Sequence, residues 1–199
     1  MHTNYQHPLS LPSAEAIPRE SLALFEGVKK KFGFVPNAIT AFSPSPVVLV
    51  AYLKIAELVS KTSFTPAEQH AGALIVSQYH NCGYCLAAHG TIGQSVGLSS
   101  KTVVALQTGE PLNDARLEAL RTLLVSILDT RGFADAEAIE AFKEAGFNDT
   151  QLLEAVLLVT WETLANFTNH LHDTPIDPEF AANAAPEASS AEGSACTCA

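Results

Sequence analysis

Two cysteines and a histidine are spaced so that they can carry out redox chemistry together. Cys82 and Cys85 are three residues apart, and His89 follows Cys85 by four residues in a stretch of helical periodicity. Residues three and four apart lie on one face of a helix, so the two thiols and the imidazole are expected to be neighbours. A disulfide between Cys82 and Cys85 would close only a tiny loop and would stabilise the fold little. We therefore interpret the pair as a redox couple.

The expected position of the pair on its helix favours a reactive thiol. Cys82 lies at the start of a helix predicted over about residues 83–96, where unpaired N–H groups and the helix dipole favour a thiolate. His89 can accept the Cys85 proton or stabilise its thiolate, which is a usual way to activate a thiol near neutral pH. The pattern predicts nucleophilic thiol chemistry assisted by a histidine.

Other interpretations of the cysteines stay open. Cys82 and Cys85 could be a buried structural pair, or could bind zinc together with His89 and a fourth ligand. No second pair at zinc-finger spacing lies inside the region expected to fold, so neither a metal nor a cofactor is expected. Cys196 and Cys198 could supply ligands or act as a resolving thiol pair, or they could be an incidental part of the chain end.

The elements that must position these residues are all helical. No run of alternating β-branched residues between turn signals is present, so the predicted class is all-α. Start and stop signals, such as the capping box Thr65-Pro66-Ala67-Glu68 and the stop at Gly97, mark the helix ends. They predict helices over about 21–33, 46–61, 66–80, 83–96, a short one after Ser99, 114–131, 134–145 and 150–170. We expect a Pro-rich leader over 1–20, one helical domain over 21–180 and a disordered tail over 181–199.

Composition limits the partners. The 199 residues are 47% hydrophobic and carry 21 acidic against 11 basic side chains, giving a formal net charge of -10. This charge repels phosphate backbones and argues against nucleic acid as a partner. No secretory signal and no membrane-spanning segment are predicted, so we expect a cytoplasmic protein with no membrane partner. Reducing conditions there disfavour structural disulfides.

The stretch from Phe64 to His89 resembles the signature of the alkylhydroperoxidase D-like branch of the carboxymuconolactone decarboxylase superfamily. The likeness covers most of residues 20–180 and includes Gly97-Leu98-Ser99, the helix over 116–132, Asn166-Phe167-Thr168-Asn169-His170 and Thr174-Pro175-Ile176-Asp177. It implies an all-α fold that forms homo-oligomers, often trimers or hexamers. It also implies peroxide reduction in which Cys85 attacks as a thiolate, Cys82 resolves the sulfenic acid as a disulfide, and His89 belongs to the proton relay. An external thiol or a reductase partner would then reduce the disulfide.

The sequence departs from the family pattern at two positions. Relatives usually place a relay glutamate twelve residues before the first cysteine, where this chain has His70. His70 could itself serve as the base, since its unperturbed pKa is near ~6.5. Glu68 is expected to be used in the capping box. Tyr84 stands where the best-known alkylhydroperoxidases carry a histidine between the cysteines.

The sequence therefore predicts a thiol-dependent, antioxidant peroxidase that reduces hydroperoxides, organic ones in particular, through a Cys82/Cys85 cycle with His89 and His70. A lyase acting on a carboxylated lactone is an alternative, although that reaction does not need two cysteines. A non-enzymatic oligomer that senses redox state or binds metal is another. Asn166, Asn169 and His170 share a helix face that could approach the site, although we interpret it as a polar face near a helix end.

Overall fold

The computed structural model describes residues 9–186 and shows helices and no strand within that range, which confirms the all-α prediction. Two short 3-10 helices, η1 and η2, lie near the two ends of the described part, at Ala14–Ala16 and Ala181–Asn183. The α-helices are α1 Arg19–Phe32, α2 Asn37–Phe42, α3 Pro46–Val59, α4 Pro66–Tyr79, α5 Gly83–Ser95, α6 Ser100–Thr108, α7 Ala115–Asp129, α8 Ala136–Glu144 and α9 Asp149–His172.

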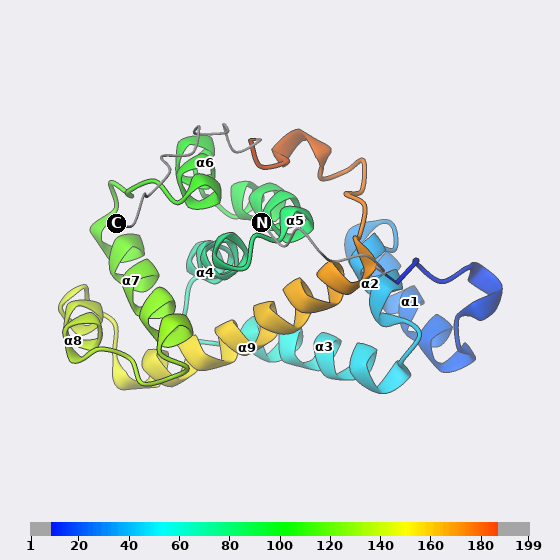
Figure 1. The fold of residues 1–199 in the computed structure, drawn as a ribbon, viewed down its shortest axis with the longest axis horizontal. Coiled ribbons are helices and arrows are strands. Elements are labelled where there is room, and N and C mark those ends of the chain that lie inside the picture. The colour runs from blue at the N-terminus through cyan, green and yellow to red at the C-terminus, as the bar shows by residue number, and fades with distance from the viewer. Residues whose placement is uncertain (1–8, 187–199) are drawn as a thin grey trace, which may run out of the picture.

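Helix α4 lies at the centre of the molecule, and α5, α6, α7 and α9 pack against it. Figure 1 shows α5 and α6 beside and above it, α7 and α8 on the left, and α1 and α2 on the right. The long helix α9 crosses below α4 and runs beside α3. Because α4, α5 and α9 are in mutual contact, side chains from three separate segments can meet at one place.

The structure differs from the sequence prediction at a few boundaries. Helix α2 was missed, because its six residues between two proline-containing turns are too few to show a helical period. Helix α1 begins at Arg19, two residues before the predicted domain start. Residues 181–186, assigned to the tail, include η2, whose Asn183 accepts from Gln94 Nε2 at 2.8 Å. Residues 1–8 and 187–199 lie outside the described part of the chain.

The buried apolar side chains form two main clusters. One fills the space between α4, α6, α7, α8 and α9, and the other joins α1, α2 and α3 to the start of α5. A small third cluster of Val59, Ala73 and Trp161 lies between α3, α4 and α9. Cys82 and Cys85 belong to the second cluster, so the predicted redox pair is part of the packed interior.

The turn between α4 and α5 fixes the backbone at Cys82. The amide of Cys82 donates to Ser77 O at 2.8 Å, and the amide of Asn81 donates to Gln78 O at 3.0 Å. These two bonds are the Schellman pattern that ends a helix, and it requires a left-handed residue at Asn81, whose φ is 57°. Cys82 is then extended and is the N-cap of α5. The same turn thus ends α4 and places the first thiol at the start of the next helix.

Helices α4 and α9 pack closely against each other. A Cβ built on Gly72 would lie 2.7 Å from Leu158 Cδ2, a side chain that is fully buried. A larger residue on α4 at this position would therefore require the buried side chain of Leu158 to shift. One turn beyond Leu158 on the same face of α9 lies Glu162, which this packing directs toward α4 and α5.

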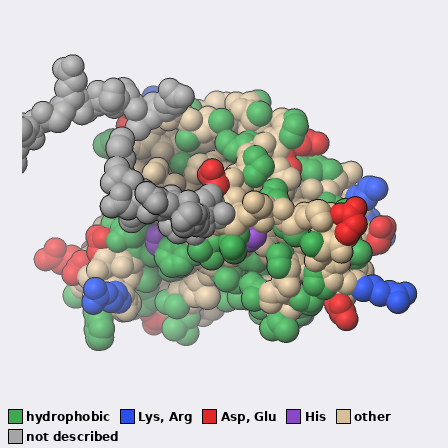
Figure 2. Space-filling model, turned by 45° about the vertical axis from the view of Figure 1, so that its right-hand side comes forward, with side chains coloured by type: hydrophobic (Ala, Val, Ile, Leu, Met, Phe, Trp, Pro, Cys, Tyr) green, Lys and Arg blue, Asp and Glu red, His purple; other side chains and the backbone are tan. Residues whose placement is uncertain are grey.

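The surface carries exposed apolar side chains as well as charge. Figure 2 shows many apolar side chains on one face, with most charged groups of that view toward its two edges. Among the residues that the structure describes, no helix combines the length and hydropathy needed to cross a membrane.

Candidate active site

The structure brings Cys82 and Cys85 together as the spacing predicts. They approach to 3.0 Å without a disulfide bond, and their side chains are 1% and 3% exposed. Asn169 Nδ2 donates to Cys85 Sγ at 3.2 Å. Both thiols are free to cycle between a dithiol and a disulfide with little backbone movement.

A buried carboxylate from another helix lies beside His89. Glu162 of α9 is fully buried, and its Oε2 lies 3.2 Å from His89 Nε2. Ser77 Oγ donates to Glu162 Oε1 at 2.7 Å, and Asn166 Nδ2 donates to the same oxygen at 3.0 Å. A buried carboxylate needs such partners, and here they come from α4, α5 and α9.

Sequence reasoning missed Glu162. One signal could have found it, since α9 places Ala155, Leu158, Glu162, Ala165 and Asn166 on one buried face. A carboxylate at a core position of an amphipathic helix is seldom buried unless it is paired. The sequence gives no way to tell which partner on another helix it would meet.

His89 and His70 form a pair next to this carboxylate. His70 Nδ1 lies 2.9 Å from His89 Nδ1, while the other ring nitrogen of His89 faces Glu162. Burial, followed by the neighbouring His89, lowers the pKa of His70 to about 3. Neutral His70 can therefore accept a hydrogen bond from His89, and it orients the ring rather than serving as a strong base at neutral pH.

The polar face of α9 is part of the site and not only a helix end, as the sequence interpretation had it. Asn166 and Asn169 are buried and bond to Glu162 and Cys85, respectively. Their Oδ1 atoms have no hydrogen-bond partner among the described residues. His170 is more exposed, and a hydrogen bond with Cys82 raises its pKa. The helix thus supplies a carboxylate, two amides and an imidazole.

The two thiols lie in opposite electrostatic surroundings. The pKa of Cys82 is lowered to about 6. The largest cause is a hydrogen bond from Cys85, which together with a hydrogen bond from His170 outweighs the opposing effect of burial. Burial raises the pKa of Cys85 well above its ordinary value. The neighbouring Cys82 and the negative charge of Glu162 act in the same direction. The N-cap position of Cys82 acts in the same direction, because backbone N–H groups at a helix start favour a negative charge. The arrangement favours a thiolate on Cys82 and a proton on Cys85.

Glu162 stays ionised despite its burial. Burial acts to raise its pKa, but the charge of His89 and the hydrogen bonds from His89, Ser77 and Cys85 outweigh it. The pKa of Glu162 is therefore below its ordinary value, and the group is a carboxylate that accepts a hydrogen bond from Cys85.

Glu68 is held in a structural role. Its Oε2 accepts from the Thr65 amide at 2.8 Å in the predicted capping box, and its Oε1 pairs with Arg116 Nε at 2.6 Å. These contacts tie the start of α4 to α7 and leave the carboxylate occupied.

Replacing Glu68 with alanine is expected to lower the free energy of unfolding by roughly 1–2 kcal/mol, from the lost cap and a partly exposed ion pair. Glu68→Gln should lose less, because glutamine can still complete a capping box. Chemical denaturation measures both losses. The rate of Cys82–Cys85 oxidation should be unchanged in each variant, and a large drop in that rate would give Glu68 a part in the proton relay.

Tyr84, the residue between the cysteines, anchors the helix that carries them. Its hydroxyl donates to Asp177 Oδ2 at 2.6 Å, and the Asn37 amide donates to the same carboxylate at 3.0 Å. The start of α5 is thereby joined to α2 and to the segment after α9. Tyr84 therefore positions the dithiol and is not itself placed to exchange protons with it.

Metal binding finds no support in the described residues. No group of three or more His, Cys, Asp or Glu side chains in residues 9–186 is arranged to hold an ion. Cys196 and Cys198, which the sequence left as possible ligands, lie outside that range.

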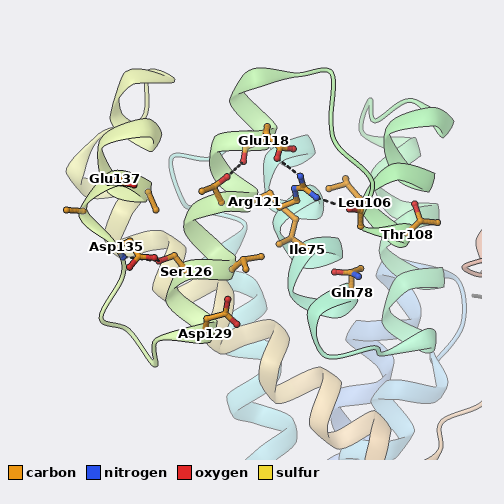
Figure 3. A pocket seen from close by; sticks show the side chains of 15 residues that line it. Ile75, Gln78, Leu106, Thr108, Glu118, Arg121, Ser126, Asp129, Asp135 and Glu137 are labelled. Carbon is orange, nitrogen blue, oxygen red and sulfur yellow. Dashed lines mark hydrogen bonds and ion pairs between the residues drawn. The ribbon is translucent and has the colours of Figure 1, made fainter. Parts of the chain in front are cut away.

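One hollow in the surface lies away from the thiols. It has a volume of about 920 Å³ and is bordered by α4, α6, α7 and α8. Figure 3 shows its polar border, where Arg121 Nη1 donates to Gly109 O at 3.0 Å and Ser126 Oγ donates to Asp135 Oδ2 at 2.9 Å. None of the thiol or histidine side chains lines it, so its size says nothing of the redox chemistry.

No family model matches the sequence, and no curated protein matches it significantly. Solved structures do match. An uncharacterized peroxidase-related protein from Silicibacter sp. TM1040 superposes with a TM-score of 0.74 at 22% identity, over 90% of this chain and 97% of that chain. An alkylhydroperoxidase AhpD core protein from Ralstonia eutropha JMP134, also an uncharacterized peroxidase-related protein, gives 0.77 at 20% identity, over 88% and 96%.

The debrominase Bmp8 has the same fold, with a TM-score of 0.68 at 18% identity over 92% of this chain and 97% of that chain. Its structure has also been solved in complex with 2,3,4-tribromopyrrole. These likenesses show that the chain has the fold of the alkylhydroperoxidase D-like proteins, which confirms the resemblance seen in the sequence at the level of fold.

Proposed function

We propose that this protein is a thiol-dependent peroxidase-like oxidoreductase of the alkylhydroperoxidase D-like branch, reducing hydroperoxides at Cys82 and Cys85. One observation carries the proposal. Two thiols approach to 3.0 Å, one with a lowered pKa and the other beside a buried Glu162–His89 pair. A stable core would not need a carboxylate, two imidazoles and two thiols in one interior site.

Cys82 carries out the first step. Its thiolate attacks the outer oxygen of the peroxide, the O–O bond breaks, and Cys82 becomes a sulfenic acid. The departing alkoxide needs a proton, and His170 is placed at Cys82 to give one. The unpartnered Oδ1 atoms of Asn166 and Asn169 offer acceptors for the peroxide hydroxyl.

Cys85 carries out the second step. It gives its proton to Glu162 and attacks the sulfur of Cys82, so that the S–S bond forms and the sulfenic oxygen leaves as water with a proton. Ser77 and Asn166 hold Glu162, while His70 holds His89. The balance is one peroxide and two thiols converted to one alcohol, one water and one disulfide.

These roles exchange the two cysteines relative to those that the family resemblance implies. In that scheme Cys85 attacks and Cys82 resolves. In this chain Cys85 is buried beside a carboxylate that opposes a second negative charge, whereas Cys82 is at a helix start. The local field therefore favours Cys82 as the attacking thiolate.

The thiolate of Cys82 should form at unusually low pH. Titration by ultraviolet thiolate absorbance is expected to show a transition with a midpoint near pH 6, since the pKa of Cys82 is about 6 and the thiolate is the form present above it. Cys82→Ser should remove this transition, and His170→Gln should move it to higher pH by removing a hydrogen bond. A single transition near the ordinary thiol pKa of ~8.5 would contradict the assignment.

We also propose that the protein forms a homo-oligomer, such as a trimer or hexamer, in the cytoplasm. Helices α3 and α9 expose apolar side chains that a monomer would leave in water, namely Val47, Val50, Leu58, Leu153, Val156 and Phe167. Exposed apolar side chains that gather into one patch mark association faces.

Reductive dehalogenation is a second candidate, favoured by the shared fold with a debrominase and by the aromatic side chains around the thiols. The ring of Trp161 packs edge-on against the ring of His89, with 5.2 Å between the ring centroids. Tyr52 lies near both thiols, whose charges, after burial and Glu162, raise its pKa. The same dithiol would transfer two electrons to a halogenated aromatic ring. A lyase that acts on a carboxylated lactone would not need two cysteines. An oligomer that senses redox state or binds metal would not need a substrate.

One experiment separates these functions. Pre-reduced, metal-free protein is mixed with cumene hydroperoxide, a bromopyrrole or a carboxylated lactone, with a dithiol reductant present. Reductant-dependent consumption of the peroxide supports the proposal, and release of bromide supports the second candidate. Decarboxylation of the lactone without thiol loss, or no turnover of any substrate, would overturn the peroxidase assignment.

A further inference from the structure

We propose that Tyr52 is a further catalytic residue, whose hydroxyl donates a hydrogen bond to the oxygen that leaves the hydroperoxide, and that Trp161 positions this hydroxyl. This role rests on the proposed function, since it belongs to the first step of that cycle. Tyr52 lies on α3, a helix that supplies none of the thiols, imidazoles or amides of the site. Helix α3 runs beside α9, which carries Trp161 (Figure 1).

Tyr52 lies between the thiols and Trp161. Among the partly buried apolar side chains of the described residues, Tyr52 alone packs against both the cluster that contains Cys82 and Cys85 and the small cluster that contains Trp161. Its ring stacks on the buried ring of Phe42, with 4.4 Å between the centroids and 17° between the planes. A ring locked by packing in this way holds its hydroxyl in one place relative to the thiols.

The charges of the site act on the Tyr52 hydroxyl. Burial raises the pKa of Tyr52 well above its ordinary value, and the charges of Glu162, Cys85 and Cys82 act in the same direction. The hydroxyl therefore keeps its proton throughout the cycle and serves as a hydrogen-bond donor. The indole of Trp161 acts the other way, so its N–H lies near the Tyr52 oxygen, although it makes no hydrogen bond there.

Buried polar atoms without a hydrogen-bond partner gather on one helix beside Tyr52. In the part of the chain that the structure describes, all of them belong to α9: Trp161 Nε1, Glu162 Oε2, Asn166 Oδ1 and Asn169 Oδ1. Trp161 Nε1 is the donor among them. A buried donor without a partner is costly, and at a reactive site it is explained by a bond that forms during the reaction. Turning of the Tyr52 hydroxyl toward a substrate would complete this bond.

The assigned step balances in atoms and charge. The Cys82 thiolate attacks the outer oxygen, an S–O bond forms, and the O–O bond breaks with its electron pair on the inner oxygen. Tyr52 O–H donates to this developing alkoxide, while Trp161 N–H donates to the Tyr52 oxygen and strengthens its hydroxyl as a donor. The alkoxide takes its proton from His170, as in the proposed cycle. Such a donor lowers the barrier most where the leaving oxygen holds negative charge poorly.

Two oxidants that differ in their leaving oxygen test this role. tert-Butyl hydroperoxide leaves an alkoxide, whereas peracetic acid leaves a carboxylate, which is stable without a donor. Tyr52→Phe keeps the stacking on Phe42 and removes only the hydroxyl. In a single turnover of the reduced full chain, it is expected to slow the reaction with tert-butyl hydroperoxide by about 10²-fold and that with peracetic acid far less. Alkylation of Cys82 by iodoacetamide should keep its wild-type rate, because the thiolate itself is intact.

Two further variants complete the set. Tyr79→Phe is the matched control, because it removes a hydroxyl that donates to Asp129 at the surface at 2.7 Å, and it should react as wild type with both oxidants. Trp161→Phe keeps an aromatic ring beside His89 and should lose about tenfold with tert-butyl hydroperoxide alone. Added to Tyr52→Phe, it should cost nothing more, since Trp161 acts through the Tyr52 hydroxyl.

Three other results would overturn these assignments. Equal losses with both oxidants in Tyr52→Phe, or no loss with either, would remove Tyr52 from the reaction while the wild type still consumes peroxide. Losses that multiply in the double variant would show that Trp161 does not act through Tyr52. A wild-type chain that consumes neither oxidant would overturn the proposed function itself and this role with it.

Discussion

Glu162→Gln is expected to slow disulfide formation by about 10²-fold or more while leaving the first attack on peroxide intact. In the proposed cycle Glu162 accepts the proton of Cys85, so its loss blocks the resolving step. The Cys82 sulfenic acid should accumulate and be trapped by dimedone, with stopped-flow peroxide loss at the wild-type rate for one turnover.

The fold should survive this change. Glutamine keeps an oxygen for the hydrogen bonds from Ser77 and Asn166, and it removes the buried negative charge itself. Glu154→Gln, two turns earlier on α9 where the carboxylate accepts from the Ser63 amide at 2.8 Å, is the matched control. Disulfide formation at the wild-type rate in Glu162→Gln would remove Glu162 from the proton path.

Cys82→Ser and Cys85→Ser are expected to fail at different steps. Cys82→Ser removes the resting thiolate, so peroxide consumption should fall by on the order of 10³ or more. Cys85→Ser should still consume about one peroxide per chain and stop at a Cys82 sulfenic acid, since only the resolving thiol is missing. Single-turnover peroxide assays with dimedone labelling distinguish the two.

Both variants are best made with Cys196→Ser and Cys198→Ser, so that no other thiol resolves the sulfenic acid. The parent for comparison is then C196S/C198S alone. Sulfenic acid on Cys85 in Cys82→Ser, with an inert Cys85→Ser, would return the two cysteines to the roles that the family resemblance implies.

The local features of this fold could be predicted from the sequence because their causes are local. The capping box at Thr65 and Glu68 and the stop at Gly97 gave helix ends within about two residues of those observed. The i, i+3 spacing of Cys82 and Cys85 was enough to bring the thiols together. Helix α2 was missed because six residues carry too little periodic signal.

The missing parts of the site depend on contacts between distant segments. Glu162 meets His89 across 73 positions of sequence, through a close packing of α9 on α4 that depends on the absence of a side chain at Gly72. No feature of the sequence around Glu162 identifies His89 as its partner. For the same reason Asn169 was interpreted as part of a polar helix end. Its hydrogen bond to Cys85 joins residues that are 84 positions apart in the sequence.

His70 shows how a sequence position can be placed at a site while its role there depends on its surroundings. The position matches the relay residue of relatives, and His70 does lie at the site, 2.9 Å from His89. Burial lowers its pKa to about 3, so in the proposed cycle it holds the ring of His89 and Glu162 is assigned as the acid–base group.

The most direct measurement counts free thiols before and after one equivalent of hydroperoxide in reduced, metal-free C196S/C198S protein. The redox-pair assignment predicts the loss of two thiols per chain, mapped to a Cys82–Cys85 disulfide, with one alcohol formed. Thiols that survive the peroxide unchanged would contradict it and leave the site to another chemistry, with the lyase and dehalogenation reactions the next to assay.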